Sequence, residues 1–221
     1  MLKIAYAGTL AGYDPAANTT EISLIKKLFW TYRNNFFLSL TRSGYYLFKA
    51  IELLKKEYGV TSNDLSVNLW GNIDDENKKQ IKQFKIDDLV TIEGYKSKNE
   101  TYNQLKTADV LFLPLELNSD KHNTLFIPGK VFEYFKLEKP ILILSQNSDC
   151  LSLVEKSGLG IVAPPKNPEE IAKILLHYIK QPHLLSTIRP NKEFIASCSF
   201  DEKTKQIAAI FDKVIAYKEI I

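Results

Sequence analysis

Apolar residues follow two alternating periods along the chain. Some short runs are apolar at nearly every position, which predicts strands buried on both faces. Between these runs, apolar residues recur every three or four positions, as from Leu47 to Tyr58, and this spacing predicts helices. The predicted strands are Lys3–Ala7, Leu65–Trp70, Leu89–Ile92, Val110–Leu113, Pro140–Leu144 and Gly160–Val162.

Strand and helix alternate over nearly the whole length, which favours an α/β fold. We predict a single Rossmann-like, doubly wound domain over residues 1–221, with a mostly parallel sheet of about six strands. Ligands of such sheets bind at the carboxyl ends of the strands, where the strand order reverses. The segments that follow the predicted strands are therefore the first place to look for a site.

Two segments do not fit this alternation of strands and helices. Residues 19–40 carry aromatic residues at helical spacing together with Lys26, Lys27 and Arg33, and predict a helical insertion. Extra core packing, a docking surface for a partner and an interfacial membrane helix all remain open for it. Residues 201–219 predict a last helix that carries Ile207 and Phe211 on one face.

Composition narrows the class of protein. A chain of 221 residues is too short for two full Rossmann-type domains. Its net charge of +3 is too small to indicate a nucleic-acid ligand, so no nucleic-acid partner is expected. Cys150 and Cys198 have no metal-ligand spacing, which favours a reducing cytoplasm and predicts no metal site. Neither a signal peptide nor a membrane-spanning stretch is visible, so the expected location is cytoplasmic.

The most informative motif enters a helix through Pro128 and Gly129. Unpaired amides at a helix start attract phosphate groups, and a glycine allows close approach of the backbone. Lys130 would add a positive charge for a pyrophosphate, and Glu133, on the same helix face, could accept hydrogen bonds from ribose hydroxyls. A solvent-facing Lys–Glu pair beside a turn remains the alternative.

Several segments, in order, resemble the C-terminal domain of GT-B glycosyltransferases of family 4. The sharpest element is PGK-x-FEY-x(5)-P-I-L, at residues 128–142. The resemblance covers nearly the whole chain except residues 19–40. The other matching pieces are YAGTL at Tyr6–Leu10, NLWGN at Asn68–Asn72, VTIEGY at Val90–Tyr95, YNQLKTADVLFLPL at Tyr102–Leu115 and GLGIVAPPKNPEEIAKIL from Gly158 onward.

This resemblance implies that the chain is half of a GT-B fold and binds a UDP- or GDP-linked sugar. Glu133 would contact the ribose, the residues around Lys130 would meet the pyrophosphate, and the end of the third strand would hold the base. The last helix would cross to an acceptor-binding N-terminal domain. The implied donor-binding residues are Gly8, Thr9, Leu10, Gly71, Gly94, Tyr95, Pro128, Gly129, Lys130 and Glu133.

The sequence departs from the family pattern at three points. Leu125 stands eight residues before Glu133, where many relatives have a first Glu that contacts the transferred sugar. Thr9 stands where the family has an Arg after the glycine of the first strand. The Lys that the family usually carries shortly after it is also missing, and Arg42 is a candidate substitute for that Lys. The acceptor-binding half of a GT-B enzyme is also missing from these 221 residues.

Two functions therefore remain open. The first is the donor-binding part of a retaining, metal-independent glycosyltransferase of polysaccharide biosynthesis, with the nucleotide-sugar as substrate and no cofactor. Its acceptor would be held by a missing or partner N-terminal domain, and peripheral contact with the inner face of the membrane is an expectation from the family. The alternative is a non-catalytic interaction subunit or remnant that docks on a partner through residues 19–40. A sugar-nucleotide epimerase is less favoured, because few catalytic carboxylates and histidines are present.

Overall fold

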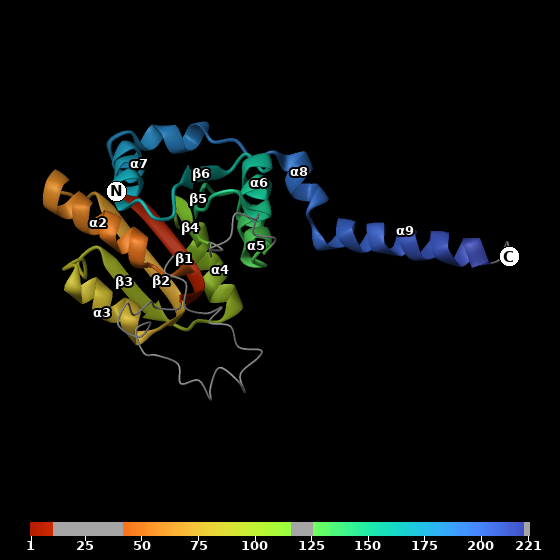
Figure 1. Cartoon of the computed structure of the whole chain (residues 1–221), viewed down its shortest axis with the longest axis horizontal. Coiled ribbons are helices and arrows are strands. Elements are labelled where there is room, and N and C mark those ends of the chain that lie inside the picture. The colour runs from red at the N-terminus through yellow and green to blue at the C-terminus, as the bar shows by residue number, and fades with distance from the viewer. Residues whose placement is uncertain (11–41, 116–125, 219–221) are drawn as a thin grey trace, which may run out of the picture.

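The computed structural model of the chain describes residues 1–10, 42–115 and 126–218. Within them, six parallel strands form one sheet in the order β3-β2-β1-β4-β5-β6 (Figure 1). This confirms the predicted Rossmann-like, doubly wound fold. The strands are β1 (Leu2–Leu10), β2 (Leu65–Ile73), β3 (Val90–Gly94), β4 (Val110–Pro114), β5 (Ile141–Leu144) and β6 (Gly160–Ala163).

Helices cover both faces of the sheet (Figure 1). α2, α3 and α7 contribute to the apolar core on one face, and α4, α5 and α6 contribute to the core on the other. Both faces of each central strand are thus buried, which is why their sequences are apolar throughout. The helices are α2 (Tyr45–Tyr58), α3 (Asp75–Gln83), α4 (Lys98–Lys106), α5 (Lys130–Leu137), α6 (Asp149–Lys156), α7 (Pro168–Lys180), the 3-10 helix η3 (Pro182–Thr187), α8 (Lys192–Ser197) and α9 (Phe200–Lys218).

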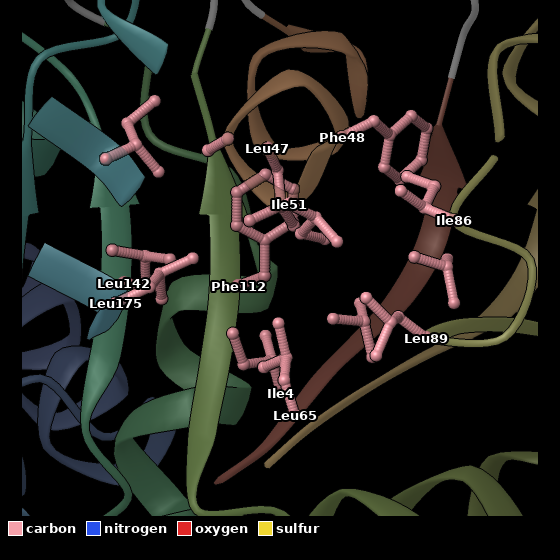
Figure 2. Close-up of a cluster of buried hydrophobic side chains, with 14 of the residues drawn as sticks. Ile4, Leu47, Phe48, Ile51, Leu65, Ile86, Leu89, Phe112, Leu142 and Leu175 are labelled. Atoms are coloured by element: carbon pink, nitrogen blue, oxygen red, sulfur yellow. The ribbon is translucent and has the colours of Figure 1, made fainter. Parts of the chain in front are cut away.

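The larger core lies between the sheet and the α2–α7 layer. Figure 2 shows Phe112 of β4 beside Leu47 and Ile51 of α2, with Ile4 of β1 in the same core cluster. All four side chains are fully buried. Since burial of one such side chain contributes about 1.5–3 kcal/mol, this layer anchors β1 and β4, whose carboxyl ends flank the site described below.

Helix starts follow the signals in the sequence. Asn167 caps α7 by accepting a hydrogen bond from the Glu170 amide at 3.0 Å. Asp74 caps α3 in the same way, accepting from the Asn77 amide at 3.0 Å. The acidic doublet of Asp74 and Asp75 is therefore explained by helix capping and by the positive end of the helix dipole.

α9 continues from α8 and extends away from the sheet (Figure 1). It confirms the predicted last helix and begins one residue earlier, at Phe200. The expected stripe, represented by Ile207 and Phe211, lies in solvent, at 54% and 62% exposure. The predicted insertion at residues 19–40 lies outside the described residues.

A buried amide ties the end of β1 to two helix starts. The Asn77 side-chain oxygen accepts from the Gly44 amide at 3.1 Å, and its nitrogen donates to the Leu10 carbonyl at 3.2 Å. Asn77 is itself fully buried. Its removal would take a buried partner from the Gly44 amide and leave the Leu10 carbonyl with only the long hydrogen bond from the Asp74 amide at 3.4 Å.

We therefore expect Asn77→Ala to lower the free energy of unfolding by about 2 kcal/mol, measured by urea denaturation. Asn191→Ala is the matched control, because this exposed residue caps α8 through the Phe194 amide at 3.1 Å. Loss of that cap should cost about 1 kcal/mol. An Asn77 variant no less stable than the Asn191 variant would contradict the proposed role of the buried bridge.

Candidate functional site

A cavity of about 280 Å³ opens at the carboxyl ends of β1 and β4. These two strands are neighbours in the sheet, and strand order reverses between them, so the cavity lies at the topological switch point. Its walls come from β1, the segment before α2, the end of β4 and the approach to α5. The lining residues are Tyr6, Gly8, Thr9, Arg42, Leu113, Pro114, Leu115, Phe126, Pro128, Gly129 and Lys130.

Two glycines bring the backbones of β1 and β2 close together beside the cavity. Gly8 and Gly71 face each other in register, with φ of +138° and +106°. A Cβ on Gly71 would lie 2.3 Å from the Gly8 carbonyl oxygen, and a Cβ on Gly8 would lie 2.6 Å from the Nζ of Lys130. The positive φ favours glycine at both positions, and at Gly71 the nearby Gly8 backbone also leaves no space for a side chain.

Lys130, the first residue of α5, reaches across the cavity toward β1. Its Nζ lies 3.7 Å from the centroid of the Tyr6 ring. Burial lowers the pKa of Lys130 to about 7; the Arg42 guanidinium lowers it as well, and the Glu133 carboxylate opposes both. The amine is therefore poised to gain charge when an anion enters.

Tyr6 connects the floor of the cavity to the β1 loop. Its hydroxyl donates to the Thr9 carbonyl at 2.7 Å. Burial raises the pKa of the Tyr6 phenol far above its usual range, against the opposing effect of Arg42, so this side chain stays a neutral donor. Tyr6 is 2% exposed and also packs on Phe112, with ring centroids 6.0 Å apart.

Arg42 supplies a second positive group. The structure brings it into the cavity wall, with its guanidinium carbon 5.3 Å from the centroid of the Phe126 ring. Arg42 was the candidate substitute for the lysine that follows the first strand in related sequences. It lies beside Thr9 and Lys130 in the lining of the same cavity.

The start of α5 faces the same space. Gly129 is its N-cap residue, no side-chain cap bonds to this end of the helix within the described chain, and Gly129 is exposed. Such an end carries partial positive charge from its backbone amides. The cavity thus combines two cationic side chains with a helix N-terminus, an arrangement suited to an anion such as a diphosphate.

Half of the sequence-predicted site residues line this cavity, namely Gly8, Thr9, Pro128, Gly129 and Lys130. The other five, Leu10, Gly71, Gly94, Tyr95 and Glu133, are not among the lining residues. Gly71 supports Gly8 from β2, as described above.

Leu10 does not line the cavity. Its side chain is fully buried, and its carbonyl accepts the hydrogen bond from Asn77. Gly94 ends β3 with φ of +72°, and Tyr95 after it is 90% exposed. Glu133 is exposed and lies one turn into α5. Its carboxylate is near enough to Lys130 to raise the pKa of that amine.

Sequence reasoning missed Tyr6 as a site residue. Alternate residues of a strand point to the same face, so Tyr6 shares a face with Gly8, which was selected. This alternation of side chains along the strand could have indicated Tyr6 as a site residue. Phe126 and Leu113 were missed as well. Both line the cavity through contacts between segments distant in sequence, which produce no local sequence pattern.

Across residues 1–10, 42–115 and 126–218, no three His, Cys, Asp or Glu side chains gather closely enough to hold a metal ion. No helix in these ranges is both long enough and apolar enough to cross a bilayer.

The family model described as glycosyl transferases group 1 matches residues 40–181, which is more than half of the chain. The chain belongs to the group 1 glycosyltransferases. A search of curated proteins gave no match.

Solved glycosyltransferase structures share the fold. The Anabaena protein Alr3699/HepE in complex with UDP superposes with a TM-score of 0.62 at 17% identity, over 96% of this chain and 49% of that one. The C-terminal domain of LpcC, a group 1 glycosyltransferase of Francisella tularensis, has a TM-score of 0.53 at 13% identity, over 89% of this chain and 85% of that one. This group 1 chain thus spans about half the length of HepE. At these identities the likeness concerns the fold.

Proposed function

We propose that this group 1 chain is the donor-binding half of a GT-B glycosyltransferase and binds a UDP- or GDP-linked sugar. The observation that carries the proposal is the cavity at the β1–β4 switch point, where Arg42, Lys130 and the start of α5 converge. Structures of HepE with UDP and with UDP-glucose support this choice of ligand by analogy of fold.

The charges of this cavity match what sugar transfer requires. When the bond to the sugar breaks, negative charge develops on the departing diphosphate. Lys130, Arg42 and the amides of α5 would stabilise that charge without a bound metal ion. Glu133 would accept hydrogen bonds from the ribose hydroxyls, and the base would lie near Gly94 and Tyr95.

An acceptor-binding domain completes the proposal. This chain spans about half of HepE, and the apolar face of α9 is exposed at Ile207, Ile210 and Phe211. Contact with a second domain would bury that face and close the cleft over both substrates. We also propose the finer assignments made above: family 4, retention of configuration, polysaccharide synthesis, and a cytoplasmic location with peripheral membrane contact.

One sequence feature favours a non-catalytic interaction subunit as the second candidate. Leu125 and Thr9 stand where related enzymes carry a Glu and an Arg that contact the donor. A chain that had lost sugar transfer could retain the fold and dock on a partner through residues 19–40, which lie outside the described residues. Failure to bind any nucleotide would favour this candidate.

Calorimetric titration with UDP and GDP tests the donor proposal. We expect one of them to bind, and Glu133→Ala to weaken that binding about tenfold, the value of one or two lost hydrogen bonds to a charged group. Glu155→Ala is the matched control, because Glu155 is an exposed glutamate of α6 outside the cavity lining. Binding of neither nucleotide, or equal affinities for both variants, would contradict the assignment.

A further inference from the structure

We propose that Tyr6 is a positioning residue for the donor diphosphate, because its ring holds the Lys130 amine in the cavity and its hydroxyl braces the β1 loop. This inference rests on the proposed function for its ligand. It assigns a role to a strand residue that would otherwise count as part of the core.

The first contact is between the ring and the amine. A lysine side chain is long and flexible, and ordering it on ligand binding has an entropic cost. Here the Nζ of Lys130 already lies 3.7 Å from the Tyr6 ring centroid, and the missing side chain of Gly8 leaves space for it. The face of an aromatic ring attracts a cation, so this contact favours the protonated amine in its place.

The second contact is the hydroxyl bond to the Thr9 carbonyl at 2.7 Å. It spans Gly8, whose φ of +138° lies outside regular strand geometry. A glycine link of this kind is conformationally permissive. The bond therefore holds Thr9 in the cavity wall in the absence of ligand.

The charged and titratable groups around Lys130 explain why the ring matters. Arg42 before α2 opposes the protonated amine, Glu133 on α5 favours it, and Tyr6 on β1 stays neutral. With burial added, the amine is only partly protonated at pH 7 before an anion arrives. The ring supplies an attraction for the cation that needs no second charge, and so keeps the amine aimed at the place where a diphosphate would lie.

A double-mutant cycle on the full chain separates this role from packing. We expect Tyr6→Leu to weaken UDP binding about tenfold at pH 7, and Tyr6→Phe, which keeps the ring, about threefold. In a Lys130→Met background, Tyr6→Leu should weaken binding only about threefold, because the ring has no amine left to position and only the hydroxyl bond to Thr9 is lost. Phe112→Leu is the matched control, since it removes a neighbouring ring of the same core that does not line the cavity.

A spectroscopic readout keeps the test independent of nucleotide. With lysine-labelled protein, the methylene protons next to Nζ of Lys130 should show an upfield ring-current shift that Tyr6→Phe retains and Tyr6→Leu abolishes. The Lys130→Met variant assigns the signal. An unshifted signal in the parent chain, or one unchanged by Tyr6→Leu, would overturn the inference.

The outcomes distinguish the two proposals. If the parent chain binds UDP and Tyr6→Leu weakens it equally in both backgrounds, the role of Tyr6 is overturned and the donor proposal stands. If the parent chain binds neither UDP nor GDP, the donor proposal fails and the diphosphate role of Tyr6 fails with it, whatever the ring-current shift shows.

Discussion

Gly71→Ala is expected to lower the free energy of unfolding by about 4 kcal/mol, through backbone strain and overpacking together. Gly71 has φ of +106°, and its new Cβ would meet the Gly8 carbonyl oxygen at 2.3 Å. The obstacle is backbone in the centre of a parallel sheet, which cannot move aside as a side-chain end can. Urea denaturation followed by circular dichroism measures the loss.

Gly59→Ala is the control for the strain of positive φ alone. Gly59 ends α2 with φ of +65°, and a Cβ there would meet no atom within 4 Å. That substitution should cost about 1 kcal/mol. Equal losses at Gly59 and Gly71 would show that the close contact between β1 and β2 adds nothing to the cost.

Lys130→Met is expected to weaken UDP binding about 100-fold at pH 7, which corresponds to about 2.7 kcal/mol, as for loss of one partner of a buried charge pair. Methionine keeps much of the aliphatic length and removes the amine. Lys136→Met on the same helix is the control, because Lys136 is exposed and lies outside the cavity lining. Its affinity should equal that of the parent chain.

The pH dependence of binding carries the same prediction with a defined sign. The pKa of Lys130 is about 7 in the free protein, and a bound diphosphate would raise it. The protonated form binds better, so the affinity should be highest near pH 7 and fall as the pH rises toward 9. The terminal phosphate of UDP, with a pKa of about 6, stays ionised over that window.

The parent chain and the Lys130→Met variant should therefore differ in the shape of the profile. Calorimetry at pH 7, 8 and 9 should show falling affinity for the parent chain and a flatter profile for the variant. Parallel profiles would mean that the titrating group is another one and would contradict the role assigned to Lys130.

The strands were predictable because each carries its signal locally. β4 and β5 are apolar at every position, as strands covered on both faces require, and both appear close to the predicted bounds. The starts of α3 and α7 could also be predicted from local sequence, because Asp74 and Asn167 cap these helices through amides only three residues away. Patterns of this kind need no knowledge of distant contacts.

The site was predictable only in part. The PGK motif pointed to Gly129 and Lys130 because a helix start is encoded by its own residues. The contact of Lys130 with Tyr6 joins residues 124 positions apart in sequence, and local sequence periodicity cannot predict it. Arg42 was suggested as a substitute for a missing basic residue of the family. Its position in the cavity wall depends on the path of the chain before α2, which the sequence alone does not give.

The sequence by itself determined the six buried strands, the helices between them and the helix start at Gly129, because hydrophobic period and capping are local properties. The tertiary structure decided that β1 and β4 lie side by side, that Gly8 and Gly71 meet, and that Tyr6 and Arg42 join Lys130 around one cavity. Those contacts depend on strand order and on the packing of distant segments, and burial between them sets the pKa of the lysine.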